Sequence, residues 1–327
     1  MKACVLVLAW NGDEVLPACL RSLAPLMGGD TTLVCIDNGS IDRSRDVIRA
    51  EAPHARLIEN ERNLGFAGGM NRGIRHAMAE AEPPDVIILL NQDTVVADDW
   101  LTKITAPFAA DDRVGAVGCK VHYPDGRRLQ HAGAGIDDIR ATTFHIGAGE
   151  EDGGQYDEPG EMPYVTGAAL ALRRTALDEV GLLDSGFHPA YYEEVDLCLR
   201  LREAGWRIRY EPAAVVAHQE SASIPDSYRR AHITERNRLR YVVKNWPVNK
   251  IRETFLPAER AHLDASGHNL ELATLRRAYL DAILHAEEWL EARRTRQAVT
   301  AEDEVCLRSL GAELRRHISA RDGTRAW

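Results

Sequence analysis

The sequence predicts an α/β protein in which a mostly parallel central sheet is covered by helices and followed by a C-terminal helical appendage. Over roughly the first 220 residues, short apolar runs alternate with segments of helical period. The runs are apolar throughout, as in strands that are buried on both faces of a parallel sheet. Beyond residue 225, long helical segments rich in Arg, Glu, Leu and Ala replace this alternation. We therefore expect two domains, at residues 1–225 and 226–327.

The first part of the chain supplies most of the expected sheet. Strands are predicted at residues 3–9, 32–37, 55–59, 86–90 and 114–121. Helices are predicted between them at residues 13–23, 42–52, 69–80 and 99–108. In the first helix Leu16, Cys19, Leu20 and Leu23 follow the i, i+3, i+4, i+7 spacing of a single buried stripe. Because ligands of such sheets bind at the carboxyl ends of the strands, functional residues are expected at that edge.

The pattern changes in the second part. Residues 122–163 are rich in Gly, Asp and Glu without a sustained period, and we expect an insertion with hairpin elements that can serve as a lid. Further strands are predicted at residues 164–172, 207–210 and 214–217, and further helices at residues 173–180, 193–204, 228–245, 270–295 and 301–320.

Composition and charge exclude several classes of protein. Hydrophobic residues make up 45% and charged residues 28% of the 327 residues, as in globular proteins. The net charge of −10 would repel a polyanion, so no nucleic acid partner is expected. The six cysteines form no CxxC pair, and we expect reduced packing residues. The sequence has no leader and no apolar stretch near the ~20 residues of a bilayer span, which predicts a cytoplasmic protein with at most peripheral membrane contact.

Polar residues follow the predicted strand 86–90. Asn91 and Asp93 alternate with Gln92, so both side chains point the same way and can offer oxygens to one cation. His218, which follows a later apolar run, can join them, and an imidazole ligand would favour Mn²⁺ over Mg²⁺. Taken alone, Asn-x-Asp is also typical of a capped turn, and a lone His is typical of a hydrogen-bonded core residue.

Two further segments end or follow strands. Asp37 ends the strand 32–37, where its carboxylate can accept a hydrogen bond from a nucleobase, although Asp-Asn-Gly-Ser is also an ordinary turn. Residues 60–71 are glycine-rich and lead into a helix, whose free N–H groups can face phosphate. This segment fits neither a P-loop nor G-x-G-x-x-G, and glycines that pack helix on sheet are the alternative.

An acidic cluster begins the helix 193–204. Helical spacing places Glu194 on the apolar stripe and Glu193 and Asp196 on a more polar side. Glu194 is therefore the carboxylate expected to point inward, as a general base facing a cleft. Burial would raise its pKa, whereas the helix N-terminus would lower it. Acidic residues are also common in any first helical turn.

Together these motifs resemble family 2 glycosyltransferases over about residues 5–223, and most nearly the rhamnosyltransferase-like enzymes of bacterial surface polysaccharides. The resemblance is carried by Ala9-Trp10-Asn11-Gly12, Asp37-Asn38-Gly39-Ser40, residues 59–71, Leu90-Asn91-Gln92-Asp93-Thr94, Tyr164-Val165-Thr166-Gly167-Ala168 and residues 192–200. It implies a GT-A fold and inverting transfer of a sugar from a dTDP- or UDP-linked donor to a hydroxyl of a glycan or lipid-linked acceptor. It also implies a divalent metal, Mn²⁺ or Mg²⁺.

The resemblance also implies roles for individual residues. The residues it assigns to the nucleotide sugar are Trp10, Asn11, Asp37, Asn38, Asn63, Gly65, Phe66, Ala67, Asn71, Asn91 and Gln92. Asn91, Asp93 and His218 would hold the metal, and Glu194 matches the base, with Glu193 and Asp196 beside it.

The sequence departs from the family pattern at three positions. Asn91 replaces an Asp, which removes a charge but keeps a carbonyl oxygen and should weaken metal binding. Glu194 replaces an Asp, which displaces the carboxylate by one methylene, and Met70 replaces an Asn.

Two other function classes stay open. A nucleotide-sugar-binding module without turnover is conceivable because of Asn91 and Glu194, whereas a Rossmann oxidoreductase is disfavoured by the missing G-x-G-x-x-G. Residues 228–252 carry eight basic residues against Glu235. This stretch can hold a lipid-diphosphate acceptor or contact an anionic membrane at its inner face, or it can be a salt-bridged helix.

Overall fold

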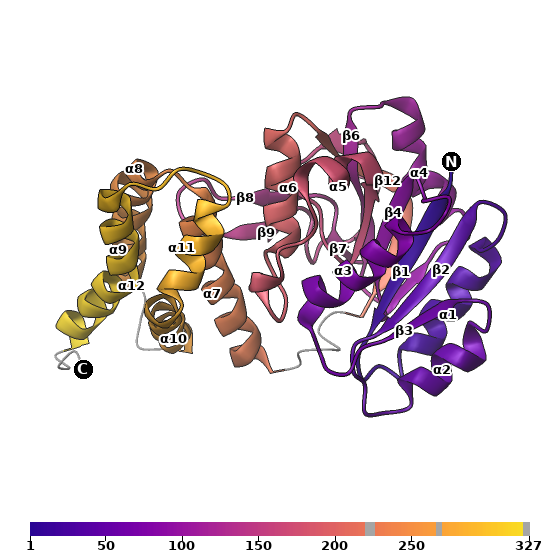
Figure 1. Cartoon of the computed structure of the whole chain (residues 1–327), viewed down its shortest axis with the longest axis horizontal. Coiled ribbons are helices and arrows are strands. Elements are labelled where there is room, and N and C mark those ends of the chain that lie inside the picture. Colours follow the sequence, from indigo (N-terminus) through magenta and orange to yellow (C-terminus); the bar gives the residue numbers. More distant parts are fainter. Residues whose placement is uncertain (220–225, 266–269, 323–327) are drawn as a thin grey trace. The chain divides into compact units, whose positions relative to one another are not determined.

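The computed structural model describes residues 1–219, 226–265 and 270–322. Their contacts divide the chain into two compact units. The first contains residues 1–136 and 143–219 and carries the sheet, and the second contains residues 137–142 together with the described residues from Asp226 onward and is helical (Figure 1). The predicted boundary after residue 225 lies at the edge of the segment 220–225, which is outside the described residues.

One mixed sheet of ten strands forms the centre of the first unit, counted over the described residues. Its main path runs β3, β2, β1, β4, β11, β6, β12, β10. The neighbours from β3 to β4 pair in parallel, as do β6 and β12, whereas β11 is antiparallel to both β4 and β6. The strands on this path are β1 (Ala3–Ala9), β2 (Thr31–Asp37), β3 (Arg56–Glu59), β4 (Val86–Asn91), β6 (Val114–His122), β10 (Gly160–Glu161), β11 (Ala169–Arg173) and β12 (Arg207–His218). The predicted mostly parallel sheet is confirmed.

Strand register brings the predicted site residues to one edge. Ala9 of β1 pairs with Asp37 at the end of β2, and Leu8 pairs with Asn91 at the end of β4. Beyond Asn91 the short strand β5 (Thr94–Val96) pairs with β12, so that Thr94 lies opposite His218. The carboxyl ends of β1, β2 and β4 therefore meet the end of β12.

Helices cover both faces of the sheet. On one face α1 (Leu16–Leu23) and α4 (Trp100–Ala110) bury Leu20 and Trp100 in the same core cluster as Val7 of β1. Full burial of one such side chain contributes about 1.5–3 kcal/mol. α2 (Ser44–Glu51) also packs on this side through Ile48.

The other face is covered closely by α3 (Gly65–Met78). A Cβ at Gly73 would lie 2.8 Å from Ile36 Cδ1, and one at Gly69 would lie 2.5 Å from Leu8 Cδ1. These glycines let the helix approach the sheet. This agrees with the alternative that the glycines of residues 60–71 serve to pack helix on sheet. The first unit also contains the helices α5 (Arg174–Val180) and α6 (Glu193–Glu203).

Several element boundaries differ from the predictions. β11 begins at Ala169 because the chain turns at the sheet edge between Tyr164 and Ala168. The two predicted final strands form one strand, β12, whose register shifts between Glu211 and Val215. The insertion forms short strands, including β7 (Leu129–His131) and a separate hairpin of β8 (Ala134–Ile136) and β9 (Thr143–His145).

The second unit is helical, as predicted, with some differences in its elements. The predicted helix 270–295 is two helices, which meet at His285. Three helical segments between residues 248 and 265 were not predicted. The helices of this unit are α7 (Ser227–Asn245), α8 (Val248–Lys250), the π-helix η3 (Ile251–Phe255), α9 (Leu256–Ala265), α10 (Leu270–Leu284), α11 (Ala286–Arg294) and α12 (Ala301–Asp322).

A buried ionic cluster around Glu259 organises the second unit. The Glu259 carboxylate is fully buried and accepts hydrogen bonds from Arg238 Nη2 at 2.5 Å, from Arg140 Nε at 2.9 Å and from the Tyr279 hydroxyl at 2.8 Å. Although burial opposes its ionisation, Arg238 and Arg140 lower the Glu259 pKa to about 2. Arg140 lies in the segment 137–142, which connects β8 and β9. This segment belongs to the helical unit.

The basic stretch 228–252, which extends from α7 into η3, is extensively paired. At least four of its eight basic residues form ion pairs within the second unit: Arg238 with Glu259, Arg240 with Glu288, Lys250 with Asp138 and Arg252 with Glu302. This pairing supports the salt-bridged alternative over an exposed cationic surface.

Two further sequence expectations concern cysteines and membrane spans. All six cysteines are unpaired and five of them are buried, in agreement with reduced packing residues. Among the described residues, no helix has both the length and the apolar character that crossing a bilayer requires.

Candidate active site

The three predicted metal ligands lie together at the end of β4. His218 Nε2 is 3.2 Å from Asp93 Oδ1 and 3.3 Å from Asn91 Nδ2. The Asp93 side chain is 6% exposed and the His218 side chain 10% exposed, so the group is almost withdrawn from solvent. A backbone bond from Gln219 N to Asp93 O, at 2.9 Å, fixes the end of β12 to this turn.

The donor set of this group fits a divalent cation. Two ligands bound at right angles at about 2.1 Å lie about 3.0 Å apart, close to the Nε2–Oδ1 distance. Over the described residues, no group of three or more His, Cys, Asp and Glu side chains is arranged for a metal. At the end of β4 such a group is missing because Asn91 stands where a third ionisable side chain would be needed. Such a cation would need further oxygen ligands from a bound substrate, as Mg²⁺ and Mn²⁺ do in phosphate-binding sites.

Gln92 fixes the loop between β1 and α1. It is buried, its Oε1 accepts from Trp10 N at 2.9 Å and its Nε2 donates to Trp10 O at 3.1 Å. In the same loop Asn11, with φ of 46°, donates its N–H to Ser40 Oγ and accepts from Ile41 N through Oδ1. Gln92 therefore positions the loop through both of its amide atoms, and Trp10 and Asn11 are held at the sheet edge.

Asp37 is buried at the end of β2. Its Oδ2 accepts from Arg45 Nε at 2.7 Å, and its carboxylate oxygens lie 3.3 Å from Ser40 N. Arg45 was not predicted as a site residue. Because Arg45 engages Oδ2, the remaining acceptor capacity of the carboxylate lies mainly on Oδ1.

Asn38 organises the glycine-rich segment. Its Nδ2 donates to Asn63 Oδ1 and to Gly65 O, both at 3.1 Å. Its Oδ1 accepts from Asn60 Nδ2 at 2.9 Å and from Leu64 N at 3.0 Å. Since these bonds use the whole amide, Asn38 builds the loop that would contact a ligand.

The start of α3 is fixed by a close backbone approach. Gly65 has φ of +73°, and a Cβ there would lie 2.6 Å from His188 Nδ1. Phe66 N donates to Pro189 O at 2.7 Å. This segment therefore leads directly toward the loop that precedes α6.

Two residues of the α3 segment lie deeper than predicted. Ala67 is 3% exposed and packs in the core. Asn71 is 4% exposed, and its amide donates to Leu183 O at 2.7 Å and accepts from Leu183 N at 3.2 Å. We therefore assign both residues to the framework of the site, because their surfaces and polar atoms are used within the fold.

The predicted polar side of α6 is wrong. Glu193 is 4% exposed and Asp196 is fully buried, whereas Glu194 is partly exposed. The pattern failed because both sides of this helix start are covered by the fold. Asp196 accepts from Arg200 Nε at 2.9 Å, and Arg200 in turn donates to Val180 O and Leu182 O. Asp196 thus anchors the preceding loop through Arg200.

Glu193 and Glu194 have unusual carboxyl groups. Oε2 of each is buried and has no hydrogen-bond partner. Burial raises the pKa of Glu194 to about 7. Burial and the charge of Glu194 raise the pKa of Glu193 well above its usual range. The preceding residues Tyr191 and Tyr192 have φ of 77° and 74°, a strained backbone that is most often found at functional sites.

The turn 164–168 lies between the start of α6 and the end of β4. A Cβ built on Gly167 would lie 3.5 Å from the Phe66 ring and 3.9 Å from Glu194 Cβ. The next residue, Ala168, accepts from Asn91 N at 2.9 Å. Glu194, Phe66 and Asn91 therefore border the same turn.

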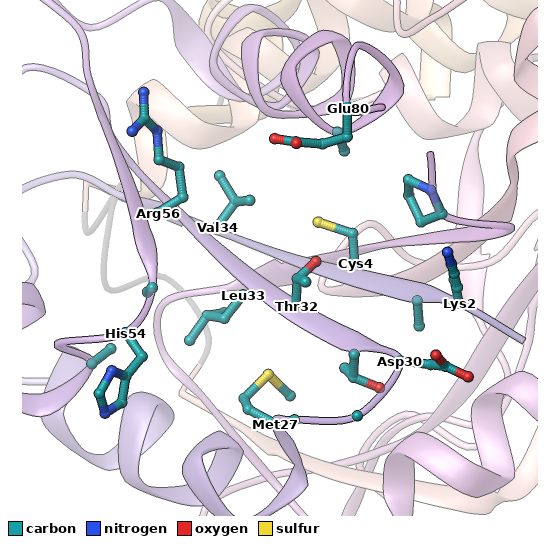
Figure 2. A pocket seen from close by; sticks show the side chains of 18 of the residues that line it. Lys2, Cys4, Met27, Asp30, Thr32, Leu33, Val34, His54, Arg56 and Glu80 are labelled. Atoms are coloured by element: carbon teal, nitrogen blue, oxygen red, sulfur yellow. The ribbon is translucent and has the colours of Figure 1, made fainter. Parts of the chain in front are cut away.

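A separate cavity of about 1180 Å³ lies at the opposite edge of the sheet. It is bordered by Lys2 and Asp30 on one side and by His54 and Arg56 on the other (Figure 2). These residues precede or begin β1, β2 and β3, so the cavity is at the amino ends of the strands. It contains none of the predicted site residues.

The first unit thus combines a mixed α/β sheet with a carboxyl-edge site that holds a paired Asp and His and a buried carboxyl group. Residues 4–181 match the family model described as glycosyl transferase family 2, which covers more than half of the chain. The chain belongs to this family of glycosyltransferases, as the resemblance predicted.

Relatives in sequence include rhamnosyltransferases. The chain is 28% identical over 247 residues to an N-acetylglucosaminyl-diphospho-decaprenol L-rhamnosyltransferase of Mycobacterium tuberculosis, covering 70% of this chain and 80% of the relative. It is 25% identical over 235 residues to the O-antigen chain rhamnosyltransferase RfbN of Salmonella typhimurium, covering 70% of each. Protein y4gI of Sinorhizobium fredii is 31% identical over 220 residues, which are 64% of this chain but only 23% of that protein.

Solved structures share the fold. The structure of GalNAc-T7 with UDP, GalNAc and Mn²⁺ aligns with a TM-score of 0.59 at 17% identity, over 88% of this chain and 57% of that chain. The mannosyltransferase PcManGT of Pyrobaculum calidifontis, in complex with GDP-Man and Mn²⁺, aligns with a TM-score of 0.52 at 15% identity, over 98% and 86%. These similarities confirm the predicted GT-A fold.

Proposed function

We propose that this protein is an inverting, metal-dependent glycosyltransferase that transfers rhamnose from a dTDP- or UDP-linked donor to a hydroxyl of a glycan or lipid-linked acceptor. The observation that carries the proposal is the meeting of Asp93 and His218 beside the turn that Glu194 borders. The rhamnosyltransferases among the relatives support the choice of sugar and a role in surface polysaccharide synthesis.

The proposed chemistry assigns one step to Glu194. In its deprotonated form it removes the proton from the acceptor hydroxyl while the hydroxyl oxygen attacks the anomeric carbon. The new glycosidic C–O bond forms as the bond from that carbon to the nucleoside diphosphate breaks, which inverts the configuration. With a pKa of about 7, a substantial fraction of Glu194 can act as a base at neutral pH.

The other residues bind and orient. Asp93 and His218, with Asn91 beside them, would hold a divalent cation, which when bound would stabilise the negative charge that develops on the leaving diphosphate. Asp37 would accept a hydrogen bond from a uracil or thymine, and the Trp10–Asn11 loop and Phe66 would contact the same nucleotide. The carboxyl edge of the sheet is the expected place for such a ligand.

A donor and acceptor panel tests the proposal. Parent protein with Mn²⁺ is expected to release nucleoside diphosphate from dTDP-rhamnose or a UDP-sugar, and to give a product of inverted anomeric configuration by NMR. Asp93→Ala should lower the rate by at least 10²-fold, because it removes the carboxylate ligand. Asp98→Ala, an exposed Asp a few residues later, is the matched control and should retain the parental rate.

One outcome would favour the alternative function. If the parent binds nucleotide but releases no diphosphate with any donor and acceptor pair, the chain is a nucleotide-sugar-binding module. The Asn at position 91, which weakens the metal site, is the feature that makes this outcome conceivable.

A further inference from the structure

Gln130 lies directly behind the imidazole of His218. Its Oε1 is 2.6 Å from His218 Nδ1, and its Nε2 is 3.5 Å from the backbone oxygen of the same residue. Both residues are buried, Gln130 to 7% and His218 to 8% exposure. One amide thus contacts both the ring and the main chain of His218, from the side opposite Asn91 and Asp93.

The strand pairing explains why Gln130 reaches this position. Leu129 of β7 pairs with His122, and His131 pairs with the adjacent residue Val121, so Gln130 is the extra residue of a β-bulge. A bulge redirects one side chain of a strand, and bulges recur beside active sites. The insertion therefore sends a single polar side chain toward the end of β12.

We propose that Gln130 is a positioning residue, which holds His218 in the tautomer that carries its proton on Nδ1 and presents Nε2 to Asn91 and Asp93. An amide oxygen only accepts, so the 2.6 Å contact requires a proton on Nδ1. The contact from Gln130 Nε2 to the His218 carbonyl oxygen fixes the orientation of the Gln130 amide, since the reversed amide would place two oxygens together.

This tautomer gives the metal site its geometry. With the proton on Nδ1, the lone pair of Nε2 faces Asp93 Oδ1 at 3.2 Å, and two acceptors so close are stabilised by a shared cation. Partners of this kind orient the ring of a ligating His, and their loss typically lowers metal affinity about 10–100-fold. The inference deepens the proposed function, since it rests on a cation at Asp93 and His218.

Direct Mn²⁺ binding tests the consequence for the metal. Mn²⁺ affinity in the presence of UDP is measured by EPR of the free ion for the parent, Gln130→Met and Gln130→Glu. Gln130→Met keeps the length of the side chain but offers only a weak thioether acceptor, and it should weaken binding about 10–100-fold. Gln130→Glu still accepts from Nδ1 and should stay within about 3-fold of the parent. The matched control is Gln155→Met, an exposed Gln of the same insertion, which should bind as the parent does.

Long-range ¹⁵N–¹H NMR of the protein without metal identifies the tautomer of His218. The His218 signal is assigned as the one that is absent from the spectrum of the His218→Asn variant. The parent should show the proton on Nδ1, and Gln130→Met should lose this preference. A proton on Nε2 in the parent, or parental Mn²⁺ affinity in Gln130→Met, would overturn the inference. If the parent takes up no Mn²⁺ with UDP, the proposed metal dependence fails, while the NMR result still decides the role of Gln130.

Discussion

Two adjacent carboxyl groups at the start of α6 have different surroundings. Glu194 is partly exposed and borders the turn 164–168, whereas Glu193 is buried behind it. Burial raises the pKa of both carboxyl groups, and the charge of Glu194 raises the pKa of Glu193 further. A carboxyl group that ionises near neutrality suits the general base proposed for Glu194, and its burial sets that pKa.

The substitution Glu194→Gln should lower kcat by about 10²–10⁴-fold, because the amide cannot remove a proton. In the parent, kcat/KM should fall as the pH drops below about 7, where Glu194 becomes protonated. Initial rates across pH 5–9 measure both effects. Glu194→Asp should retain measurable activity; equal rates for Glu194→Gln and the parent would exclude Glu194 as the base.

Glu193 gives a prediction on stability. Its folded pKa is raised above the unfolded value of about 4.5, so the folded state binds more protons and parental stability falls as the pH rises above that value. Glu193→Gln imitates the neutral carboxyl and should gain about 1–3 kcal/mol over the parent at pH 8 and little at pH 4. Urea unfolding at both pH values measures the difference. A pH-independent difference would contradict the prediction; Glu203→Gln at the exposed end of the same helix should show none.

Among the elements, the loop that leads into α3 depends on close packing at Gly65. Gly65→Ala would place a Cβ 2.6 Å from His188 Nδ1 in a left-handed backbone conformation. We expect a loss of about 2–4 kcal/mol, from strain and overpacking together, with weaker nucleotide binding. Thermal unfolding measures the loss.

Gly149 is the matched control for this substitution. It has φ of +84° and open space around the position of a Cβ. Gly149→Ala should cost only the conformational strain of about 1–2 kcal/mol. Equal losses at the two positions would show that packing against His188 does not matter.

Strands could be predicted from the sequence where burial on both faces of the sheet alone determines the residue pattern. β1 has the predicted bounds because its run of apolar residues is buried on both faces. β11 starts later than predicted, since Tyr164 and Val165 are buried beside the α6 segment without continuing the strand. Burial alone therefore does not distinguish a strand from a packed turn.

The partners of polar side chains were less predictable than their positions. The meeting of Asn91, Asp93 and His218 was predicted, because strand ends of one sheet share an edge. Gln130 was not, because its place depends on a bulge in a segment without periodicity. Asn71 was assigned to the nucleotide, yet its amide pairs with Leu183, a partner 112 residues away that no local pattern indicates.

In the second unit, the fully buried Glu259 accepts hydrogen bonds from Arg140, Arg238 and Tyr279, and we expect this cluster to stabilise the unit. Glu259→Ala should destabilise this unit by about 3–5 kcal/mol, because Arg140 and Arg238 lose a buried partner. The Glu259 pKa is lowered to about 2, so its stabilisation is present above pH 4.5 and is lost as the pH falls toward 2. Calorimetry at pH 7 and at pH 3 measures both effects.

The control for the cluster is Glu302→Ala, which removes an exposed partner of Arg252. Its effect should be below about 1 kcal/mol. A Glu259→Ala protein as stable as this control at pH 7 would show that the cluster is dispensable.

We propose that the nucleotide sugar binds at the carboxyl edge of the sheet. A crystal structure with UDP and Mn²⁺, using anomalous scattering to locate the ion, would show where both bind. We expect the ion at Asp93 and His218, the uracil ring of UDP beside Asp37, and the terminal phosphate of UDP on the side of Glu194. UDP in the cavity between Lys2 and Arg56, with no ion at Asp93, would contradict the claim.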